Sequence, residues 1–395
     1  MSNYAVTGYW KEGPDEDLLS AWAGRLRRQL DAPRVSFGLV FMTPEFARTA
    51  PQTLEVLRVH AQIPLLLGCS STGLIIGGRE IEDAPGLVLS LFALPGAEAH
   101  GVHFSQEQVQ RADGPAYWEQ ETGLAAAQLK GWLTFVEPFH TDAEAWLRGW
   151  NESYAPKPIL GGLASGKPSD RGTQVYLNGQ VFEEGGVAVA FSGDVELLSV
   201  ISQGCTPIGQ TWTITKAEGN YIHEIANRPA YEVLADTFMT LTAQEQRLAR
   251  GNLFVGLVVN EYLEDFARGD FLVRNILGGD PKSGSLMVGA LARAGQTIQF
   301  QRRDAAAATE DMLAMLDKFG SRLGEREIYG GCLCNCNGRG QGLFGHPNHD
   351  AGLVQEKLGP MELTGFFCNG EIGPVGERNF LHGYTASLAV LAGTK

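Results

Sequence analysis

Three short segments, each bounded by glycines, hold many of the side chains that could do chemistry. They are residues 68–73 (Gly-Cys-Ser-Ser-Thr-Gly), 161–166 (Gly-Gly-Leu-Ala-Ser-Gly) and 365–370 (Gly-Phe-Phe-Cys-Asn-Gly). The thiol, hydroxyl and acidic groups in or beside them are Cys69, Ser70, Ser71, Cys368 and Glu371. Glycine leaves room for the polar end of a ligand, and a carboxylate such as Glu371 could hold a ligand ammonium group. An equally simple interpretation is that Glu371 forms a salt bridge or caps a loop.

Cys69 and Cys368 also raise the hypothesis of a thiol-dependent enzyme. A thiol attacks efficiently only when a base such as histidine lies within hydrogen-bond reach. The sequence contains no G-x-S-x-G nucleophile elbow, and free cysteines in such loops are usually packed. We therefore expect no catalytic residue and no enzymatic activity.

A second motif-rich region surrounds Arg339. Asn337 and Arg339 precede residues 340–345, which match the spacing of a dinucleotide fingerprint, but the next helix begins only beyond Pro347. The glycines still expose backbone N–H groups, and a guanidinium beside them is a good receptor for carboxylate or phosphate. The alternative is an arginine that ties down the glycine-rich loop. Residues 161–167 nearly match the P-loop sequence pattern, but Pro168 stands at the position where a P-loop has the Ser or Thr that binds magnesium.

Cysteines and histidines near the C-terminus raise the question of a metal or haem. Cys332, Cys334 and Cys336 alternate along an expected strand, and three histidines follow: His346, His349 and His382. Structural zinc usually takes C-x2-4-C pairs, whereas alternating cysteines are typical of buried strand residues, so we expect no metal site. One imidazole in an apolar cavity would suffice for haem, although no spacing marks an axial ligand. We expect no cofactor, with haem as the alternative.

Composition narrows the function classes. The chain has 395 residues, with 31 Lys and Arg against 45 Asp and Glu, which gives a net charge of −14. Such a charge argues against nucleic acid or an anionic membrane as the partner, since both select basic patches. Six cysteines are too sparse for a disulfide scaffold. The acidic start is unlike a signal peptide, and no apolar run approaches the roughly 20 residues of a membrane span, so we expect a cytoplasmic protein.

The order of elements around each glycine-bounded segment repeats. A strand, a helix and a second strand come before each segment, and a further strand follows it. The first strands are expected at residues 35–42, 132–136 and 328–336, and the helices at 51–61, 143–153 and 349–358. This repetition predicts an α/β fold of duplicated strand-helix-hairpin units, forming mixed β-sheets stacked with helices outside. We expect the units to pair about a pseudo-twofold axis, which would bring their loops into two facing clusters.

The motifs resemble those of the FIST (F-box and intracellular signal transduction) domains. Residues 336–340, 365–374 and 380–385 resemble the C-terminal FIST domain, whereas residues 68–73, 161–162 and 215–230 resemble the N-terminal one. The resemblance covers roughly residues 35 to 390. We therefore expect an N-terminal helical arm at residues 1–34, an N-type FIST domain at 35–230 and a C-type FIST domain at 231–395.

The resemblance implies a sensory protein. FIST domains are thought to bind small molecules such as amino acids, and part of the family resembles haem-binding nitric oxide sensors that regulate histidine kinases. We expect a small-molecule sensor that binds an amino acid or similar anionic or zwitterionic metabolite between the two domains and signals to a separate partner such as a histidine kinase or cyclase. The expected ligand-binding residues are Cys69, Ser70, Ser71, Asn337, Arg339, Cys368, Glu371 and His382. The alternatives are a haem-binding nitric oxide sensor and a thiol-dependent enzyme.

Overall fold

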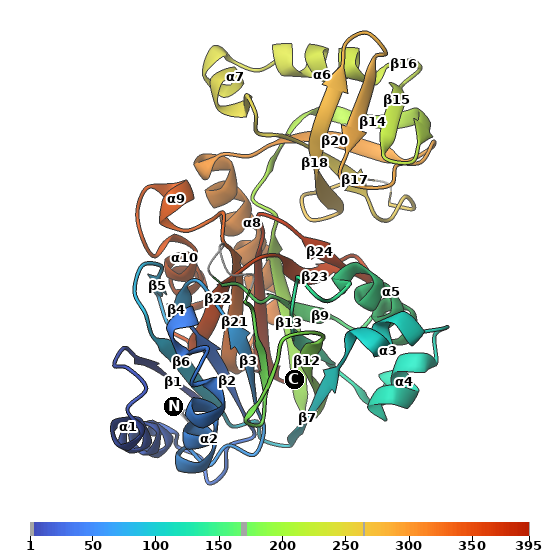
Figure 1. The fold of residues 1–395 in the computed structure, drawn as a ribbon. Coiled ribbons are helices and arrows are strands. Elements are labelled where there is room, and N and C mark those ends of the chain that lie inside the picture. Colours follow the sequence, from blue (N-terminus) through green and yellow to red (C-terminus); the bar gives the residue numbers. More distant parts are fainter. Residues whose placement is uncertain (1–3, 167–171, 264, 395) are drawn as a thin grey trace. The chain divides into compact units, whose positions relative to one another are not determined.

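The computed structural model describes residues 4–166, 172–263 and 265–394, which form two compact units (Figure 1). The first unit combines residues up to 201 with residues from 316 onward, and the second consists of residues 202–315. The chain therefore leaves the first unit and later returns to complete it.

The first unit contains three copies of one arrangement of elements. The first copy consists of β1 (Ala5–Trp10), α1 (Glu16–Gln29), β2 (Phe37–Met42), a short 3-10 turn, α2 (Ala50–His60), β3 (Leu66–Ser70), the hairpin β4 (Leu74–Ile76) and β5 (Arg79–Ile81), and β6 (Leu87–Phe92). The second consists of β7 (Ala97–Phe104), α3 (Gln106–Arg111), α4 (Tyr117–Thr122), β8 (Gly131–Val136), α5 (Ala143–Tyr154), β9 (Ile159–Leu163), the hairpin β10 (Val175–Leu177) and β11 (Gln180–Phe182), and β12 (Gly186–Gly193).

The third copy is interrupted by the second unit. It starts with β13 (Val195–Ser202) and resumes with α8 (Ala305–Leu323), whose residues up to 315 belong to the second unit, and with β21 (Ile328–Cys336). It continues through α9 (Gln341–Phe344), α10 (His349–Leu358), β22 (Leu363–Cys368), the hairpin β23 (Glu371–Val375) and β24 (Arg378–His382), and β25 (Ala386–Gly393). In the order of elements α8 thus holds the place of α1 in the first copy and of α3 and α4 in the second, and the second unit is inserted between β13 and the last part of α8.

The copies are joined by a cyclic exchange of hairpins. The three sheets have the strand orders β1-β6-β2-β3-β10-β11, β7-β12-β8-β9-β23-β24 and β13-β25-β21-β22-β4-β5. Each sheet therefore takes its last two strands from another copy. In every sheet the central pair is parallel: β2 with β3, β8 with β9, and β21 with β22. The expected mixed sheets are confirmed, but three copies in cyclic order replace the expected pseudo-twofold pairing.

One glycine in each copy makes the close approach of the parallel strands feasible. A Cβ atom on Gly68 would lie 1.7 Å from the carbonyl oxygen of Val40, and one on Gly161 would lie 1.8 Å from that of Thr134. In the third copy, a Cβ atom on Gly365 would lie 2.0 Å from the carbonyl oxygen of Leu333. These are the first glycines of the three glycine-bounded segments. They are needed for strand packing rather than for ligand space.

The three sheets enclose one apolar core and carry helices on their outer faces. Side chains from all three sheets meet in the core, for example Phe41, Phe135 and Phe366, whose rings contact one another. Alternate residues point outward, where α1 and α2 cover the first sheet and α5 covers the second. Helices outside stacked sheets are what the sequence predicts. The first 34 residues contribute β1 to the first sheet as well as the amphipathic helix α1.

In its described residues, 202–263 and 265–315, the second unit is an antiparallel sheet with two short helices and the first part of α8. Its elements are β14 (Thr206–Glu218), β15 (Tyr221–Ile225), β16 (Arg228–Pro229), α6 (Ala230–Met239), α7 (Ala243–Ala249), β17 (Leu253–Val258), β18 (Phe271–Asp280), β19 (Ser285–Val288) and β20 (Thr297–Arg302). Because β14 pairs with both β20 and β15, the sheet closes into a ring. Apolar side chains of α6, such as Val233 and Leu234, share its core.

Candidate functional site

The three glycine-bounded segments meet at the carboxyl ends of β3, β9 and β22. The Ser70 hydroxyl donates to the carbonyl oxygen of Ser165 at 2.9 Å, and the Ser71 hydroxyl donates to that of Phe367 at 3.0 Å. The side-chain amide of Asn369 donates to the carbonyl oxygen of Ala164 at 3.0 Å. One loop cluster therefore unites all three copies, where two facing clusters were expected. In open α/β sheets this end of parallel strands is the usual place for ligands.

A pocket of about 470 Å³ opens at this loop cluster. Its lining residues are Thr72, Gly73, Glu82, Asp83, Phe139, Gly166, Asn337, Phe367 and Asn369. They come from all three copies, and every one of them belongs to the first unit. We call this cavity the loop pocket.

A chain of hydrogen bonds crosses the loop pocket. The Thr72 hydroxyl donates to Asn337 Oδ1 at 2.8 Å, and Asn337 Nδ2 donates to Asn369 Oδ1 at 2.9 Å. Asn369 Nδ2 in turn donates to Ala164, as described above. A carboxamide nitrogen has two hydrogens, so each asparagine retains a second N–H that a ligand could accept. Glu82 and Asp83 add negative charge at the same pocket.

Glu371 and Cys368, both buried, form a cluster with the half-buried Cys336 behind these loops. The Cys368 thiol donates to Glu371 Oε1 at 3.3 Å, and the backbone N–H of Thr385 donates to Oε2 at 2.8 Å. Burial raises the pKa of Glu371 to about 8, against the opposing effect of these hydrogen bonds. Burial and the nearby Glu371 raise the pKa of Cys336 to about 12. Glu371 is thus a buried acid that is largely protonated at neutral pH, and it does not line the loop pocket.

Arg339 is held in a buried ion pair. Its guanidinium is 1% exposed and donates to both carboxylate oxygens of Asp350, from Nε at 2.6 Å and from Nη2 at 2.8 Å. A further hydrogen bond reaches the carbonyl oxygen of Tyr384 at 3.3 Å. Burial alone would raise the pKa of Asp350, but the charge and hydrogen bonds of Arg339 hold it below its usual value. This geometry is that of an arginine tying its loop to α10, the alternative given above.

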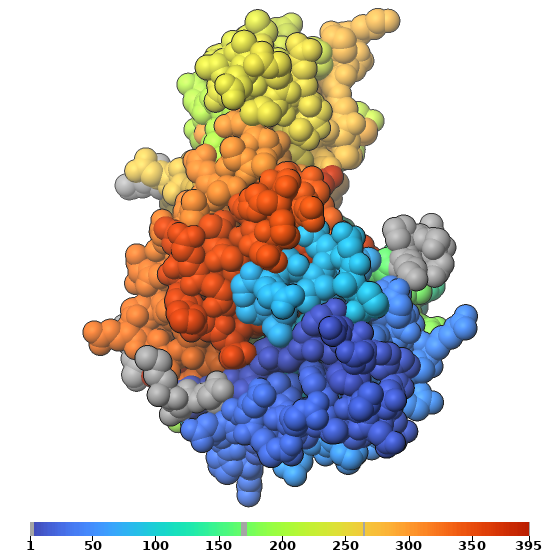
Figure 2. Space-filling model, turned by 90° about the vertical axis from the view of Figure 1, so that its left-hand side faces the viewer, coloured from blue at the N-terminus to red at the C-terminus, as the bar shows by residue number. Residues whose placement is uncertain are grey.

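The β4–β5 hairpin is anchored to the same region. Glu80 accepts hydrogen bonds from the backbone N–H groups of His349 at 3.1 Å and Ala351 at 2.9 Å. Glu82 accepts one from the backbone N–H of Gln341 at 2.9 Å. In Figure 2 the lighter blue surface that includes this hairpin lies against the orange-red surface of the third copy. These contacts fix Glu82 at the rim of the loop pocket.

The family follows from comparison with known proteins. A model of the FIST N domain matches residues 36–228, and a model of the FIST C domain matches residues 230–374. The chain belongs to the FIST family. FIST domains indicate a small-ligand-sensing domain of signal transduction. This protein therefore shares the family and its general role, which the sequence motifs predicted.

Relatives of this FIST protein extend over nearly its whole length. An uncharacterized protein of Mycobacterium tuberculosis (strain H37Rv) is 32% identical over 368 residues, which cover 93% of this chain and 94% of the relative. One of Mycobacterium bovis is 33% identical and covers 93% of each chain. A crystal structure titled as a cyanuric acid hydrolase from A. caulinodans covers 99% of both chains at 11% identity, with a TM-score of 0.36. That level of likeness carries no conclusion about activity.

Of the eight expected ligand-binding residues, the structure places Asn337 in the lining of the loop pocket. Cys69 lies in the central core, and burial raises its pKa well above the usual value. Ser70 and Ser71 are buried, and their hydroxyls bind backbone carbonyl groups. His382 is also buried, with Nε2 3.0 Å from the carbonyl oxygen of Gly373. These side chains, like Arg339, Cys368 and Glu371, support the loops from behind.

Sequence reasoning missed Thr72 and Asn369. Both stand four positions after the first glycine of their segment, and Ser165 is their counterpart in the second copy. A comparison of equivalent positions in the three segments could have found them. Lys167 and Pro168, from the near P-loop match, lie outside the described residues.

Metal and membrane features were also sought within the described residues. There, no group of three or more His, Cys, Asp or Glu side chains is placed to hold a metal ion. Cys332 and Cys334 pack in the central core. None of the helices in the described ranges combines the length and apolar character that crossing a bilayer requires.

Proposed function

We propose that this FIST protein is a cytoplasmic, non-enzymatic sensor that binds an amino acid or a similar small zwitterion in the loop pocket and signals to a separate protein. The observation that carries the proposal is the hydrogen-bond chain from Thr72 through Asn337 to Asn369, which joins polar side chains of different copies at one cavity. Convergent polar groups in a preformed cavity are the usual mark of a small-molecule site.

The lining supplies partners for both charges of a zwitterion. The remaining N–H groups of Asn337 and Asn369 can donate to a carboxylate, and Asp83 and Glu82 can accept from an ammonium group. Phe139 and Phe367 give the pocket apolar surface for a side chain. A purely anionic ligand would meet two carboxylates, so the proposal favours a zwitterion over an organic anion.

The proposal includes no catalytic step and no resident cofactor. Burial raises the pKa of both Cys69 and Cys368, which keeps these thiols protonated and poorly nucleophilic. The Cys368 sulfur lies 3.3 Å from both Glu371 Oε1 and the carbonyl oxygen of Asn335, and these two acceptors share its one hydrogen. His349 stacks on Phe344, with the ring centroids 3.4 Å apart, and its Nδ1 lies 2.9 Å from Asp350. These contacts suit structural roles.

The signal would arise from the way the ligand joins the copies. A ligand that contacts Thr72, Gly166 and Asn369 touches the loops of all three copies at once. The ligand favours the arrangement of loops that it fits best. The shift in population between two arrangements is limited by the difference between the ligand's affinities for them. A partner such as a histidine kinase or cyclase would then recognise the favoured arrangement.

The direct test is calorimetric and thermal-shift screening of the full chain against the proteinogenic amino acids and small organic acids. We expect at least one amino acid to bind and raise the melting temperature, and Asn337→Asp and Asn369→Asp to weaken that ligand about tenfold. Each variant keeps the shape of the side chain but replaces a donor by a charged acceptor. Asn227→Asp is the matched control, because Asn227 is exposed in the second unit.

Two results would overturn this function. Either no amino acid in the panel binds, or the best ligand binds the Asn337→Asp and Asn369→Asp variants as tightly as the parent. A Soret band that appears on adding haemin and is lost with one histidine would instead establish the haem-binding alternative.

A further inference from the structure

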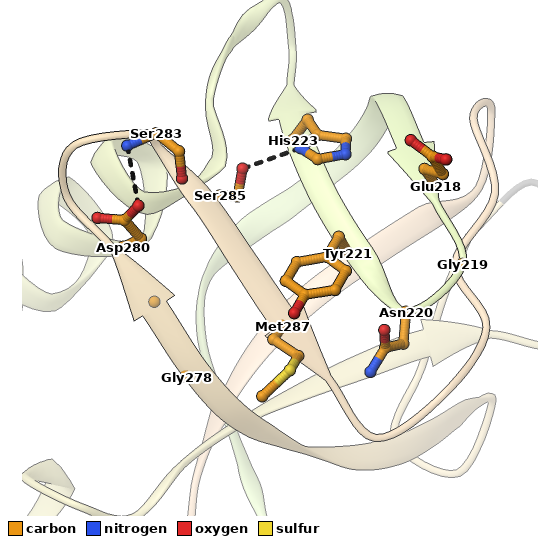
Figure 3. A pocket seen from close by; sticks show the side chains of 11 residues that line it. Glu218, Gly219, Asn220, Tyr221, His223, Gly278, Asp280, Ser283, Ser285 and Met287 are labelled. Atoms are coloured by element: carbon orange, nitrogen blue, oxygen red, sulfur yellow. Dashed lines mark hydrogen bonds between the residues drawn. The ribbon is translucent and has the colours of Figure 1, made fainter.

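A second pocket, of about 870 Å³, lies entirely within the second unit. Its lining residues are Glu218, Gly219, Asn220, Tyr221, His223, Gly278, Gly279, Asp280, Ser283, Ser285 and Met287 (Figure 3). We call it the sheet pocket. It shares no lining residue with the loop pocket, and the proposed sensor function does not use it.

The sheet pocket is built on the face of β18, β19 and β15 that turns away from the core. Ile222 and Leu286, which pair across β15 and β19, are buried in that core. Side chains alternate along a strand, so Tyr221 and Met287, the next cross-strand pair, stand on the opposite face. Figure 3 shows both pointing into the pocket.

The floor of the pocket is apolar and aromatic. The Tyr221 side chain is 45% exposed, and its ring lies nearly parallel to that of His223, at 10° with the centroids 6.3 Å apart. His223 Nδ1 lies 2.9 Å from the Ser285 hydroxyl, which fixes the imidazole ring. Beside Met287, a Cβ atom on Gly278 would find only the Met287 methyl group, at 3.9 Å, so the floor stays open there. Such a floor can pack methylene groups, and ring faces attract ammonium groups.

A carboxylate stands at each end of this floor (Figure 3). Asp280 accepts hydrogen bonds from the backbone N–H groups of Lys282 at 2.9 Å and Ser283 at 3.2 Å, and these lower its pKa. Asp280 is therefore held as an anion. Glu218 ends β14, opposite Tyr221 of β15. The lining holds these two carboxylates and neither lysine nor arginine.

The separation of the carboxylates sets the length of a ligand that would join them. Asp280 ends β18 and Glu218 ends β14, and the strands β19 and β15 lie between these two in the sheet. Three strand spacings correspond to about 14 Å. A short diamine is too short for this span, whereas a chain with three or four amines matches it.

We infer that the sheet pocket is a binding site for an aliphatic polyamine. Its terminal ammonium groups bind Asp280 and Glu218, and its methylene chain lies over Tyr221 and Met287. An anionic ligand finds no cation in the lining, and a monoamine reaches only one of the two carboxylates.

Calorimetry on the full chain at low salt tests this site with spermidine, spermine, putrescine and n-butylamine as probes. We expect spermidine or spermine to bind at least tenfold more tightly than n-butylamine, with putrescine between them. Asp280→Asn keeps the shape of the side chain and an acceptor for one of the two backbone N–H groups, and Glu218→Gln likewise keeps the shape of its side chain. Each is expected to weaken spermidine about fivefold, and the double variant about twentyfold, because the charge pairs are partly exposed.

Glu232→Gln is the control, because Glu232 is an exposed acid of α6 that does not line the sheet pocket. Equal losses in the control and in Asp280→Asn would mean non-specific attraction to an acidic protein and would refute the site. Equal affinity for n-butylamine and spermidine would refute it as well. Asn337→Asp should leave spermidine binding unchanged, so the test of this site is independent of that of the loop pocket.

Discussion

Arg339→Met should strongly destabilise the first unit, because it leaves the buried Asp350 without its guanidinium partner. Both members of the Arg339–Asp350 pair are fully buried, and the pair is bidentate. Removing one partner of such a pair costs about 3–5 kcal/mol, since the remaining ion loses its compensation but stays desolvated. In a domain of this size, a loss of that order lowers the melting temperature by roughly 5–9 °C.

An exposed pair of the same type provides the control. Arg58 also makes two hydrogen bonds to one carboxylate, that of Glu55, but this pair lies on the surface of α2. Arg58→Met should therefore cost about 0–1 kcal/mol. Circular dichroism during urea unfolding at pH 7 measures both variants, and Arg339→Lys, which keeps the charge, gives a milder variant should Arg339→Met fail to fold.

A double variant separates charge from shape. In Arg339→Met with Asp350→Leu both charges are gone, so stability should recover by about 2 kcal/mol or more relative to Arg339→Met alone. If Arg339→Met is as stable as Arg58→Met, or if the double variant is no more stable than the single one, the guanidinium does not hold the loop as argued. Arg339 would then again be a candidate for binding the carboxylate or phosphate of a ligand.

Three further outcomes follow from the first unit. Because the pKa of Glu371 is raised to about 8, folding takes up a proton, so the free energy of unfolding should fall by up to about 1.4 kcal/mol per pH unit as pH rises from about 5 to 8. Glu371→Gln should remove that slope in urea titrations, and an unchanged slope would contradict the assignment. Gly68→Ala should lower the free energy of unfolding by about 3 kcal/mol or more, since its Cβ atom would meet the Val40 carbonyl oxygen. The control Gly352→Ala in α10, which has open space around it, should stabilise slightly. Equal effects of the two variants would contradict the argument from crowding. A thiol reagent should quickly modify at most one cysteine of the native protein, the half-buried Cys336, and should modify all six after denaturation. Rapid reaction of a second thiol in the native protein would contradict the burial of the other five cysteines.

The repeated pattern of strand, helix and glycine-bounded loop was enough to predict the α/β class, but the predicted two facing loop clusters were wrong, because the loops of the three copies meet in one cluster. Local periodicity specifies each copy, because a buried parallel strand and an amphipathic helix leave clear signals. The exchange of hairpins left no such signal. Whether β4 and β5 pair with β3 or with β22 depends on contacts between residues nearly 300 positions apart, such as those of Ile76 with Thr364. Three copies were visible in the sequence, but their cyclic order was not.

The sequence singled out the loops that border the loop pocket, but of the eight expected side chains it is Asn337 that lines this pocket. Chemical reactivity singled out Cys69 and Glu371, whereas the fold buries both. Residue type says little about which side of a strand end faces solvent, because that depends on the register of the sheet. From the sequence alone, Arg339 could either bind a ligand or tie down its loop. Its partner Asp350 could be recognised only in the structure, which places α10 beside Arg339.

The cyclic arrangement explains why a repeated backbone can build an asymmetric site. The first glycine of each segment, Gly68, Gly161 or Gly365, lets the strand pass close to its parallel neighbour, so the three strand ends converge with the same geometry. Four residues later, however, the copies carry Thr72, Ser165 and Asn369, which are two hydroxyls and an amide. Ser165 is used within the protein, where it accepts from the backbone N–H of Thr72. Thr72 and Asn369 instead line the loop pocket together with Asn337. Equivalent positions thus differ in donors and acceptors, which is what recognition of a ligand with two unlike ends requires.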